Sequence, residues 1–336
     1  MTNTGRVALI IVWMGKLPSY YPLWLRSLAA NKAFDFLLFT DQPTTSVPGI
    51  AEDGPGRHPA IARIPENCRV IQLSFNELRL RIAVNLGLPV QIQHAYKLCD
   101  FKPAYGEIFS DYLADYDYWG CCDMDLLFGD LGKFVTPTLL ASYKKLFSRG
   151  HLTIYRNEPV INAAWRSSGK IDHRKIMTSP EVFLFDEWSG IHRVFEELGI
   201  PQYNAEVMGD VKVLSSRVVC FNIKNYSPQI FAWNDGRVLQ YFIDGDLQSN
   251  ELAYIHFQKR KINLAGSEVY HSKTLILNPQ SILPFDGEIT AGVVKKYDRP
   301  GYSHFLHSHY KRIKKKLNSF GENGLAINKD LIHARP

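Results

Sequence analysis

Two continuous apolar runs near the start of the chain constrain its fold more than any other feature. They are Val7–Val12 and Phe34–Phe39, and the segment between them, Pro18–Asn31, carries apolar residues at helical spacing. A continuous apolar run is typical of a parallel strand that is covered on both faces. The pattern therefore predicts a strand, a helix and a second parallel strand joined by a right-handed crossover, as in α/β proteins.

The rest of the chain extends this unit into a mixed Rossmann-type sheet flanked by helices. A connection rich in proline and glycine covers residues 42–68. Further strands are expected at Val70–Leu73, Tyr116–Cys122, His151–Tyr155 and Glu181–Phe185. Helices are expected at Phe75–Leu86, Pro103–Asp115 and Ile191–Leu198. Arg237–Ile243 and Leu252–Phe257 are expected to pair around a turn at Asp244-Gly245, within an irregular C-terminal acceptor lobe that starts near residue 150.

Composition limits the class of protein. The 336 residues suffice for one large α/β domain, predicted over residues 1–265, with a C-terminal extension over 266–336. No apolar run approaches the ~20 residues of a membrane-spanning helix, and the start of the chain lacks a signal-peptide core. The five cysteines include no Cys-x-x-Cys pair, which argues against a disulfide framework and a zinc ribbon. We therefore expect a cytoplasmic protein with core thiols.

An acidic pair, Asp123 and Asp125, directly follows the expected strand Tyr116–Cys122. Ligands of open α/β sheets bind outside the carboxyl ends of strands. Two carboxylates there form a compact oxygen site for Mn²⁺ or Mg²⁺, and such a metal neutralises a leaving nucleotide diphosphate. The alternative is a surface turn. A second acidic pair, in Asp244-Gly245-Asp246, is interpreted as a hairpin turn, because Asp-Gly is a turn signal.

Other polar side chains also follow apolar runs. His256 is a candidate metal ligand or a structural histidine, and Lys259 behind it offers charge for a diphosphate. Asp186 or Glu187 is a candidate catalytic base, with a helix N-cap as the alternative.

A further set of polar side chains is expected to contact sugar or phosphate, with solvated turns as the alternative. These residues are Lys97, Asp100, Lys102 and Arg156. The motifs of dehydrogenases, phosphate-loop kinases and serine hydrolases are absent from the sequence.

Several of these segments together resemble bacterial polysaccharide-biosynthesis glycosyltransferases of the GT-A fold, of the capsule and O-antigen type. The similarity runs in order from about residue 5 to 262. Its motifs are Gly15–Pro18, Leu23–Ser27, Phe39–Asp41, Asp100–Pro103, Trp119–Asp125 with Phe128–Asp130, Gly150–Leu152 with Tyr155–Asn157, and His256–Arg260.

The resemblance implies a role for several residues. Asp123 and Asp125 would bind Mn²⁺ or Mg²⁺ together with the diphosphate, and His256 would complete the metal shell. Val12, Trp13 and Asp41 would border the nucleotide base. The implied reaction moves a sugar, with galactofuranose among the candidates, from a UDP-linked donor to a saccharide or lipid-linked acceptor, with inversion. A nucleotidyl or phosphosugar transferase and an inactive carbohydrate-binding protein are the alternatives.

The net charge of +6 gathers partly in residues 310–317, which hold five cations. This segment is either a solvated tail or a contact for the anionic inner face of a membrane. Nucleic acid is not an expected partner, because no nucleic-acid-binding module accompanies the cluster.

Overall fold

The computed structural model describes residues 5–43, 63–212, 217–258 and 261–298. Contacts divide the chain into one compact unit, residues 1–211 with 218–298, and a second, residues 212–217 with 299–336. Of the second unit, only residues 212 and 217 are described. Lys259 and the basic segment 310–317 lie outside the described residues, so the expectations attached to them stay predictions.

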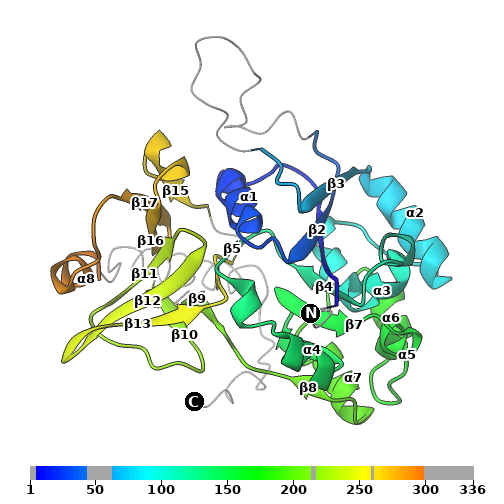
Figure 1. The fold of residues 1–336 in the computed structure, drawn as a ribbon. Helices are drawn as coiled ribbons and strands as arrows, with labels where there is room; N and C mark the ends of the chain where they lie inside the picture. The colour runs from blue at the N-terminus through cyan, green and yellow to red at the C-terminus, as the bar shows by residue number, and fades with distance from the viewer. Residues whose placement is uncertain (1–4, 44–62, 213–216, 259–260, 299–336) are drawn as a thin grey trace, which may run out of the picture. The chain divides into compact units, whose positions relative to one another are not determined.

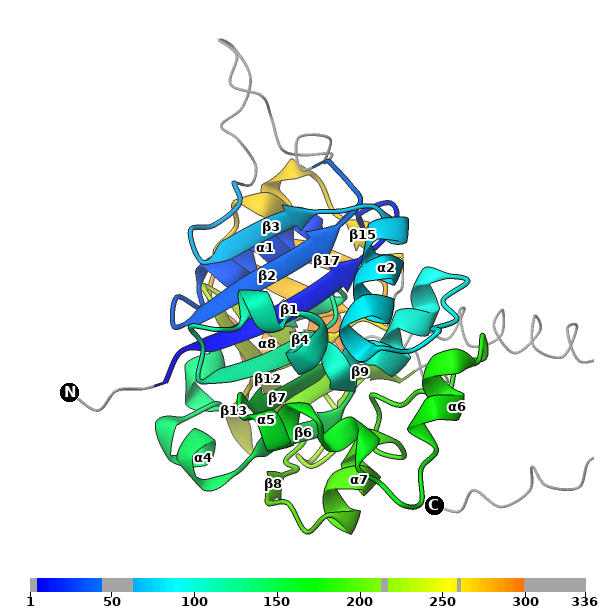
Figure 2. The ribbon, with the colours of Figure 1, turned by 90° about the vertical axis from the view of Figure 1, so that its right-hand side faces the viewer.

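A seven-stranded sheet lies at the centre of the first unit, in the order β3-β2-β1-β4-β7-β6-β8 (Figure 1). Its strands are β1 (Val7–Trp13), β2 (Phe34–Thr40), β3 (Cys68–Gln72), β4 (Tyr118–Cys122), β6 (Lys145–Arg149), β7 (Leu152–Arg156) and β8 (Gln202–Tyr203). Strands β3, β2, β1 and β4 are parallel, and β7 is antiparallel to β4. Figure 2 shows β3, β2 and β1 side by side. The predicted mixed α/β sheet and the parallel pairing of the first two strands are confirmed.

Helices cover both faces of this sheet. Helix α1 (Tyr21–Ala29) and α4 (Pro137–Ser142) pack on the face that carries Leu9 and Ile11 of β1. The other face carries Ala8 and Ile10 and is covered by five helices. They are α2 (Phe75–Leu86), α3 (Tyr105–Ile108), α5 (Pro159–Asn162), α6 (His173–Thr178) and α7 (Ile191–Glu197). Because both faces are buried, the strands read as continuous apolar runs, as the sequence pattern indicated.

Helix α2 shows how local chemistry sets an element's bounds. The Ser74 hydroxyl oxygen caps the first turn by accepting a hydrogen bond from the Glu77 backbone amide. In turn, the Glu77 carboxylate accepts a hydrogen bond from the Ser74 backbone amide. Gly87 ends the helix in the left-handed conformation at φ +61°. Such a cap stabilises a helix by ~1 kcal/mol. The predicted range of this helix is confirmed.

Two predicted elements are wrong. Residues 103–115 do not form one helix; a 3₁₀ helix (Ala95–Ala104) is followed by α3 and a short 3₁₀ turn (Ser110–Tyr112). Pro103 offers no amide hydrogen, which disfavours a regular helix there. Residues 181–185 are not a strand. The Asp100 carboxylate accepts from the amides of Phe183 and Phe185, so these amides are not available to a neighbouring strand.

A four-stranded sheet, β10-β9-β14-β5, carries part of the site described below. Its strands are β5 (Leu126–Phe128), β9 (Met208–Lys212), β10 (Arg217–Cys220) and β14 (Tyr254–His256). A six-stranded sheet has the order β13-β12-β11-β16-β17-β15. Its strands are β11 (Gln229–Asn234), β12 (Arg237–Asp244), β13 (Asp246–Leu252), β15 (Asn263–Leu264), β16 (Thr274–Asn278) and β17 (Ser281–Phe285).

The predicted pairing of residues 237–243 with residues 252–257 is wrong. The turn at Gly245, with φ +74°, is confirmed as a hairpin turn. Its register sets Asp244 opposite Asp246, so β12 pairs with β13. Residues 254–256 pair instead with β5 and β9.

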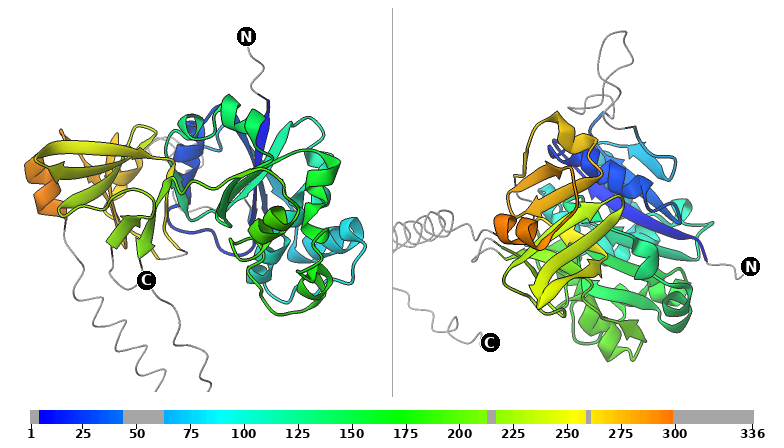
Figure 3. Two further views of the ribbon diagram at one scale, coloured as in Figure 1. Left: turned by 90° about the horizontal axis from the view of Figure 1, so that it is seen from below. Right: turned by 60° about the vertical axis from the view of Figure 1, so that its left-hand side comes forward.

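The six-stranded sheet extends past residue 265, where the C-terminal extension was expected to begin. Strands β16 and β17 belong to it, and α8 (Ala291–Tyr297) packs Val294 against Ile230 on one of its faces (Figure 3). The five cysteines are buried free thiols, as predicted. Among the described residues, no helix has the length and apolar character needed to cross a membrane.

Candidate active site

The carboxyl ends of β1 and β4 lie at one edge of the seven-stranded sheet. The two strands are adjacent and parallel, with Ile10 in register with Cys121. Val12 and Trp13 therefore end β1 beside Asp123, which follows β4. The Asp123 amide donates to the carbonyl oxygen of His151, 3.0 Å away, and this bond fixes the chain where it leaves β4.

Asp123, Asp125 and His256 form a cluster of three metal-ligating side chains. Their ligand atoms all lie within 4.8 Å of one another. Strand register accounts for the cluster: His256 pairs with Leu126, the residue after Asp125, and the Phe257 amide donates to the Asp125 carbonyl oxygen at 2.8 Å. Met124, between the two carboxylates, is fully buried in the core. Sequence spacing and pairing thus bring two distant segments to one point.

A fourth polar residue, Asp210 on β9, lies beside this cluster. It is in register with His256 on the parallel strand β14, and its Oδ1 lies 3.3 Å from His256 Nδ1. The Gln258 amide donates to both Asp210 oxygens, at 2.9 and 3.0 Å. On the other side of the imidazole, Nε2 lies 3.5 Å from Asp125 Oδ2. Burial lowers the pKa of His256, but the neighbouring Asp125 and Asp210 carboxylates outweigh it and raise the pKa to about 10.

Lys102 joins the end of β4 to the segment after residue 180. Its Nζ donates to the Asp186 carboxylate and to the Gly150 carbonyl, and it lies at the same distance, 2.8 Å, from Asp123 Oδ1. Burial alone lowers the pKa of Lys102. The charges of Asp123 and Asp186 reverse that effect and hold the pKa well above its usual value. Lys102 is therefore a fixed cation inside the site.

Asp186 and Glu187 reach the same site from an irregular segment. Gly150 allows the close approach of Asp186, because a Cβ there would lie 2.3 Å from Asp186 Oδ2. Helix α7 begins after Gly190, so the N-cap alternative for Asp186 is excluded. Burial raises the pKa of both carboxyl groups; Lys102 opposes the rise at Asp186, and the Asp186 charge adds to it at Glu187.

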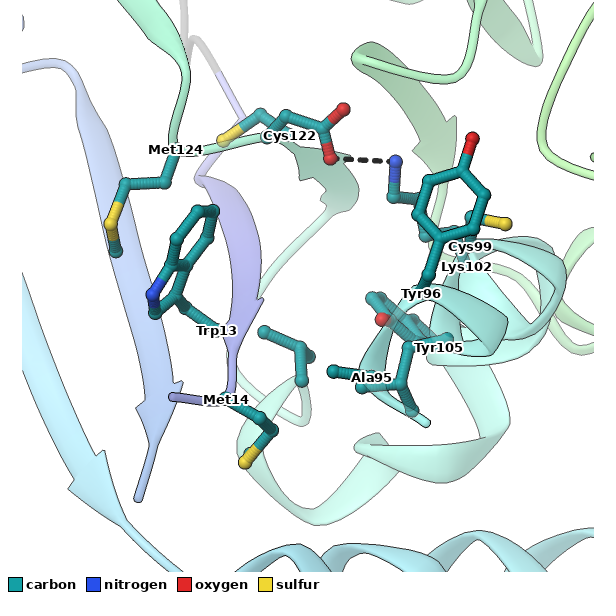
Figure 4. A pocket seen from close by; sticks show the side chains of 12 residues that line it. Trp13, Met14, Ala95, Tyr96, Cys99, Lys102, Tyr105, Cys122 and Met124 are labelled. Carbon is teal, nitrogen blue, oxygen red and sulfur yellow. Dashed lines mark ion pairs between the residues drawn. The ribbon is translucent and has the colours of Figure 1, made fainter. Parts of the chain in front are cut away.

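Two cavities share Asp123 and Lys102 in their linings. Figure 4 shows the side chains that line one of them, the apolar cavity. The apolar cavity, of about 230 Å³, is lined by Val12, Trp13, Met14, Ala95, Tyr96, Leu98, Cys99, Lys102, Tyr105, Cys122, Asp123 and Met124. The acidic cavity, of about 190 Å³, is lined by Tyr96, Cys99, Lys102, Asp123, Asp125, His151, Leu184, Asp186, Glu187, His256 and Gln258. In Figure 4, Trp13 and Tyr96 stand on opposite sides of the apolar cavity.

Two of the four described non-glycine residues with positive φ lie in the wall of the acidic cavity, and the other two, Phe147 and Asp235, line neither cavity. Leu184 and Gln258 have φ values of +55° and +54°, in the region that favours glycine. A residue held there costs ~1–3 kcal/mol, and such residues cluster at functional sites. The strain therefore supports a ligand-binding role for this wall.

Two residues expected to contact the ligand lie elsewhere. Lys97 and Asp100 are fully buried and joined by a 2.8 Å ion pair. Lys97 also donates to the Ile176 carbonyl at 2.7 Å, and Asp100 holds the amides of Phe183 and Phe185. Because neither side chain is exposed, we assign the pair a structural role: it shapes the segment that presents Asp186.

Asp41 and Arg156 are also outside the two cavities. Asp41 follows β2 and accepts from the Gly15 amide at 2.7 Å, so it braces the loop that follows β1. The Arg156 guanidinium pairs with Glu158 at 2.7 Å and lies over the Tyr118 ring. Neither contact leads into the acidic or the apolar cavity.

Sequence reasoning missed Asp210, Gln258, Gly150 and Tyr96. An acidic residue inside the apolar strand Met208–Val211 was the available signal for Asp210, since charges are rarely buried without a partner. Gly150 and Gln258 lie within segments of the resemblance, Gly150–Leu152 and His256–Arg260, but their roles and that of Tyr96 depend on contacts between distant segments.

The donor chemistry of the cluster fits a hard divalent cation. Carboxylates and one imidazole suit Mn²⁺ or Mg²⁺, and the three ligand atoms already lie close together. Because only a neutral imidazole binds a metal, a cation here would displace the proton that Asp125 and Asp210 otherwise hold on His256. The Asp210 carboxylate lies beside His256 Nδ1, and a carboxylate in this position commonly orients a metal-ligating histidine.

The fold and the site define a mixed α/β protein with an acidic, cation-suited cluster at the carboxyl edge of its main sheet. By sequence, residues 9–286 match a family of unknown function, DUF6625, and the chain belongs to that family. No protein of curated function matches the chain.

Solved structures of two enzymes show a distant likeness. The galactosyltransferase LgtC, solved with donor and acceptor sugar analogues, aligns with a TM-score of 0.33 at 12% identity, over 60% of this chain and 75% of that one. The glycosyltransferase GlyE of Streptococcus pneumoniae TIGR4 aligns with a TM-score of 0.31 at 11% identity, over 60% of this chain and 45% of that one. Likenesses this low carry no argument about function.

Proposed function

We propose that this chain is a metal-dependent glycosyltransferase that moves a sugar from a nucleotide-sugar donor to a saccharide acceptor, and that the donor is UDP-linked, in keeping with the sequence resemblance. The observation that carries the proposal is the cluster of Asp123, Asp125 and His256, which lines the acidic cavity and reaches the adjoining apolar cavity through Asp123. A nucleotide sugar consists of an aromatic base, an anionic diphosphate and a hydroxylated ring, and these parts match in character the apolar cavity, the metal-ligating cluster and the acidic cavity.

The nucleoside is assigned to the apolar cavity. Trp13 and Tyr96 face each other across it (Figure 4), and aromatic side chains pack well on a planar base. The diphosphate then lies near Asp123, where the two cavities adjoin, and the sugar occupies the acidic cavity. This order follows from the positions of the cavities relative to the cluster.

Asp123, Asp125 and His256 would hold Mn²⁺ or Mg²⁺. When bound, the metal supplies positive charge that neutralises the leaving diphosphate. Asp210 keeps the His256 imidazole turned so that Nε2 faces Asp125. Lys102 fixes the Asp123 carboxylate, so that one ligand is already oriented before any metal arrives.

Asp186 and Glu187 are the candidate bases for an inverting transfer. Both line the acidic cavity, and burial raises the pKa of each carboxyl group above its usual value, which makes a carboxylate a stronger proton acceptor. Glu187 is the less constrained candidate, since Lys102 already binds Asp186. The acceptor's hydroxyl oxygen would bond to the anomeric carbon of the sugar as the bond from that carbon to the nucleoside diphosphate breaks. The hydroxyl proton would pass to the carboxylate, and the diphosphate would leave.

The sequence resemblance extends the proposal to bacterial surface polysaccharide synthesis, with a saccharide or lipid-linked acceptor and galactofuranose among the candidate sugars. Thermal-shift screening of UDP-sugars with Mn²⁺ tests the donor assignment, because a ligand that binds the native state raises the unfolding temperature. A nucleotidyltransferase would release pyrophosphate from a nucleoside triphosphate, and a carbohydrate-binding protein would bind without turnover. No stabilisation by any nucleotide or nucleotide sugar would contradict the proposal.

A further inference from the structure

The only lysine among the described residues that line the acidic cavity has no donor left for a ligand. An ammonium group carries three hydrogen-bond donors. The Lys102 Nζ has three partners at 2.8 Å, namely Asp123 Oδ1, Asp186 Oδ2 and the Gly150 carbonyl oxygen. Its positive charge is likewise balanced by two carboxylates. Lys102 therefore organises the wall and is not available to bind an anionic group.

An acceptor in the same wall lacks a partner. Asp186 Oδ1 is buried and has no hydrogen-bond partner, while Oδ2 is held by Lys102. A buried polar atom left without a partner costs ~1–3 kcal/mol. The side chain is 5% exposed and lines the acidic cavity, so a ligand in that cavity would lie against the Asp186 carboxylate.

Three other polar side chains of the lining, those of Glu187, Gln258 and His256, also bear on which ligand the acidic cavity accepts. Glu187 adds another carboxylate to the lining, and the Gln258 amide is committed to both oxygens of Asp210. His256 is turned toward Asp125. The carboxylates of Asp186 and Glu187 thus give this part of the wall acceptors and negative charge, while the Lys102 and Gln258 donors are used within the protein.

We propose that the sugar bound in the acidic cavity is neutral or carries an amino group, and that sugars with a carboxylate, such as uronic acids, are rejected. This inference rests on the proposed function and narrows its substrate class. Hydroxyl and amino groups offer hydrogen-bond donors to the Asp186 and Glu187 carboxylates that line the cavity. A carboxylate offers none and would face Asp186 and Glu187 with like charge.

A bound divalent cation does not remove this selection. The cation would be held by Asp123, Asp125 and His256 and would neutralise the donor's diphosphate, so the Asp186 and Glu187 carboxylates would still face the sugar. Of these two, only Asp186 has a cationic partner among the described residues, and that partner is Lys102.

Titration calorimetry with Mn²⁺ and two matched pairs of donors tests the inference: UDP-glucose with UDP-glucuronate, and UDP-galactose with UDP-galacturonate. Each pair differs only at C6, where a hydroxymethyl group replaces a carboxylate. We expect each uronate to bind about tenfold more weakly than its neutral partner, which corresponds to ~1.4 kcal/mol. A uronate that binds as tightly as its partner would overturn the inference while leaving the glycosyltransferase proposal intact.

Variants separate this selection from a general loss of binding. Asp186→Asn removes one negative charge and adds an amide donor, so it should reduce the discrimination between the paired sugars. Asp246→Asn, in the exposed hairpin turn, is the matched control and should keep wild-type discrimination. Unchanged discrimination in Asp186→Asn would count against the inference. Failure of UDP and all four donors to bind the wild type would instead reject the proposed function itself, and the inference with it.

Discussion

His256 and Asp210 face each other across two neighbouring parallel strands, with Nδ1 of the imidazole 3.3 Å from Oδ1 of the carboxylate. This contact leaves Nε2 directed at Asp125. The orientation of a candidate metal ligand is therefore set by a residue that is not itself in the metal cluster.

Asp210→Asn should weaken Mn²⁺ binding by ~10–100-fold, the usual effect of losing the carboxylate behind a ligating histidine. Electron paramagnetic resonance of free Mn²⁺ measures this affinity without donor or turnover. Asp246→Asn is the control for removing a carboxylate far from the cluster. Equal Mn²⁺ affinity in the Asp210 variant and the wild type would show that the contact has no role in metal binding.

The buried pair of Lys97 and Asp100 yields a prediction about stability. Asp100→Asn leaves a charged lysine in the interior without its carboxylate, so we expect a loss of ~3–5 kcal/mol in the free energy of unfolding. Chemical denaturation measures this. Asp35→Asn, which breaks the exposed pair with Arg6, should cost less than ~1 kcal/mol and serves as the comparison. Equal effects of the two changes would refute the structural role of the buried pair.

Asp186→Asn and Glu187→Gln identify the base. The variant that removes the proton acceptor should lose ~10²–10⁴ in turnover number, measured on a matched donor and acceptor at saturating Mn²⁺. Since Lys102 already binds Asp186, we expect the larger loss in Glu187→Gln. Full activity in both variants would argue for a retaining mechanism or for a base elsewhere.

Much of the fold was predictable because its strands carry their signal locally. Strands β1 and β2 are continuous apolar runs, and β4 is an aromatic and apolar run. Runs of this length favour a strand that is buried on both of its faces. The positions of Asp123 and His256 at the end of such runs were predictable for the same reason.

The rest of the site depends on partners that are distant in sequence. Residues 181–185 have the apolar pattern of a strand, but the amides of Phe183 and Phe185 donate their hydrogen bonds to the Asp100 carboxylate. Lys97 and Lys102 have similar neighbours in the sequence, but one is fully buried and the other lines both cavities. Which lysine reaches the site is decided by tertiary packing, which the local pattern does not record.

Lys145 gives a prediction about pH. Burial lowers the pKa of this lysine to about 7, whereas its ordinary value is 10.5. Between these values the unfolded chain binds the proton and the folded chain does not, so this group makes stability rise as pH increases from 7 toward 10. Lys145→Met should remove this rise and should stabilise the fold by ~1–4 kcal/mol at pH 7, where burying the ammonium is costly.

Denaturation of the wild type and Lys145→Met at several pH values measures the difference. We expect the advantage of the methionine variant to shrink as pH rises, because the neutral amine of the wild type no longer costs desolvation. An advantage that stays constant from pH 7 to 10 would mean that Lys145 does not titrate in this range.

In the proposed reaction, Asp123, Asp125 and His256 hold a divalent cation that turnover requires. This requirement is measured by following the release of nucleoside diphosphate from a panel of UDP-sugars at increasing Mn²⁺ concentration, in the wild type and in Asp125→Ala. We predict turnover that requires Mn²⁺ in the wild type, and no measurable turnover in a folded Asp125→Ala variant. Wild-type turnover in that variant without metal would contradict the claim.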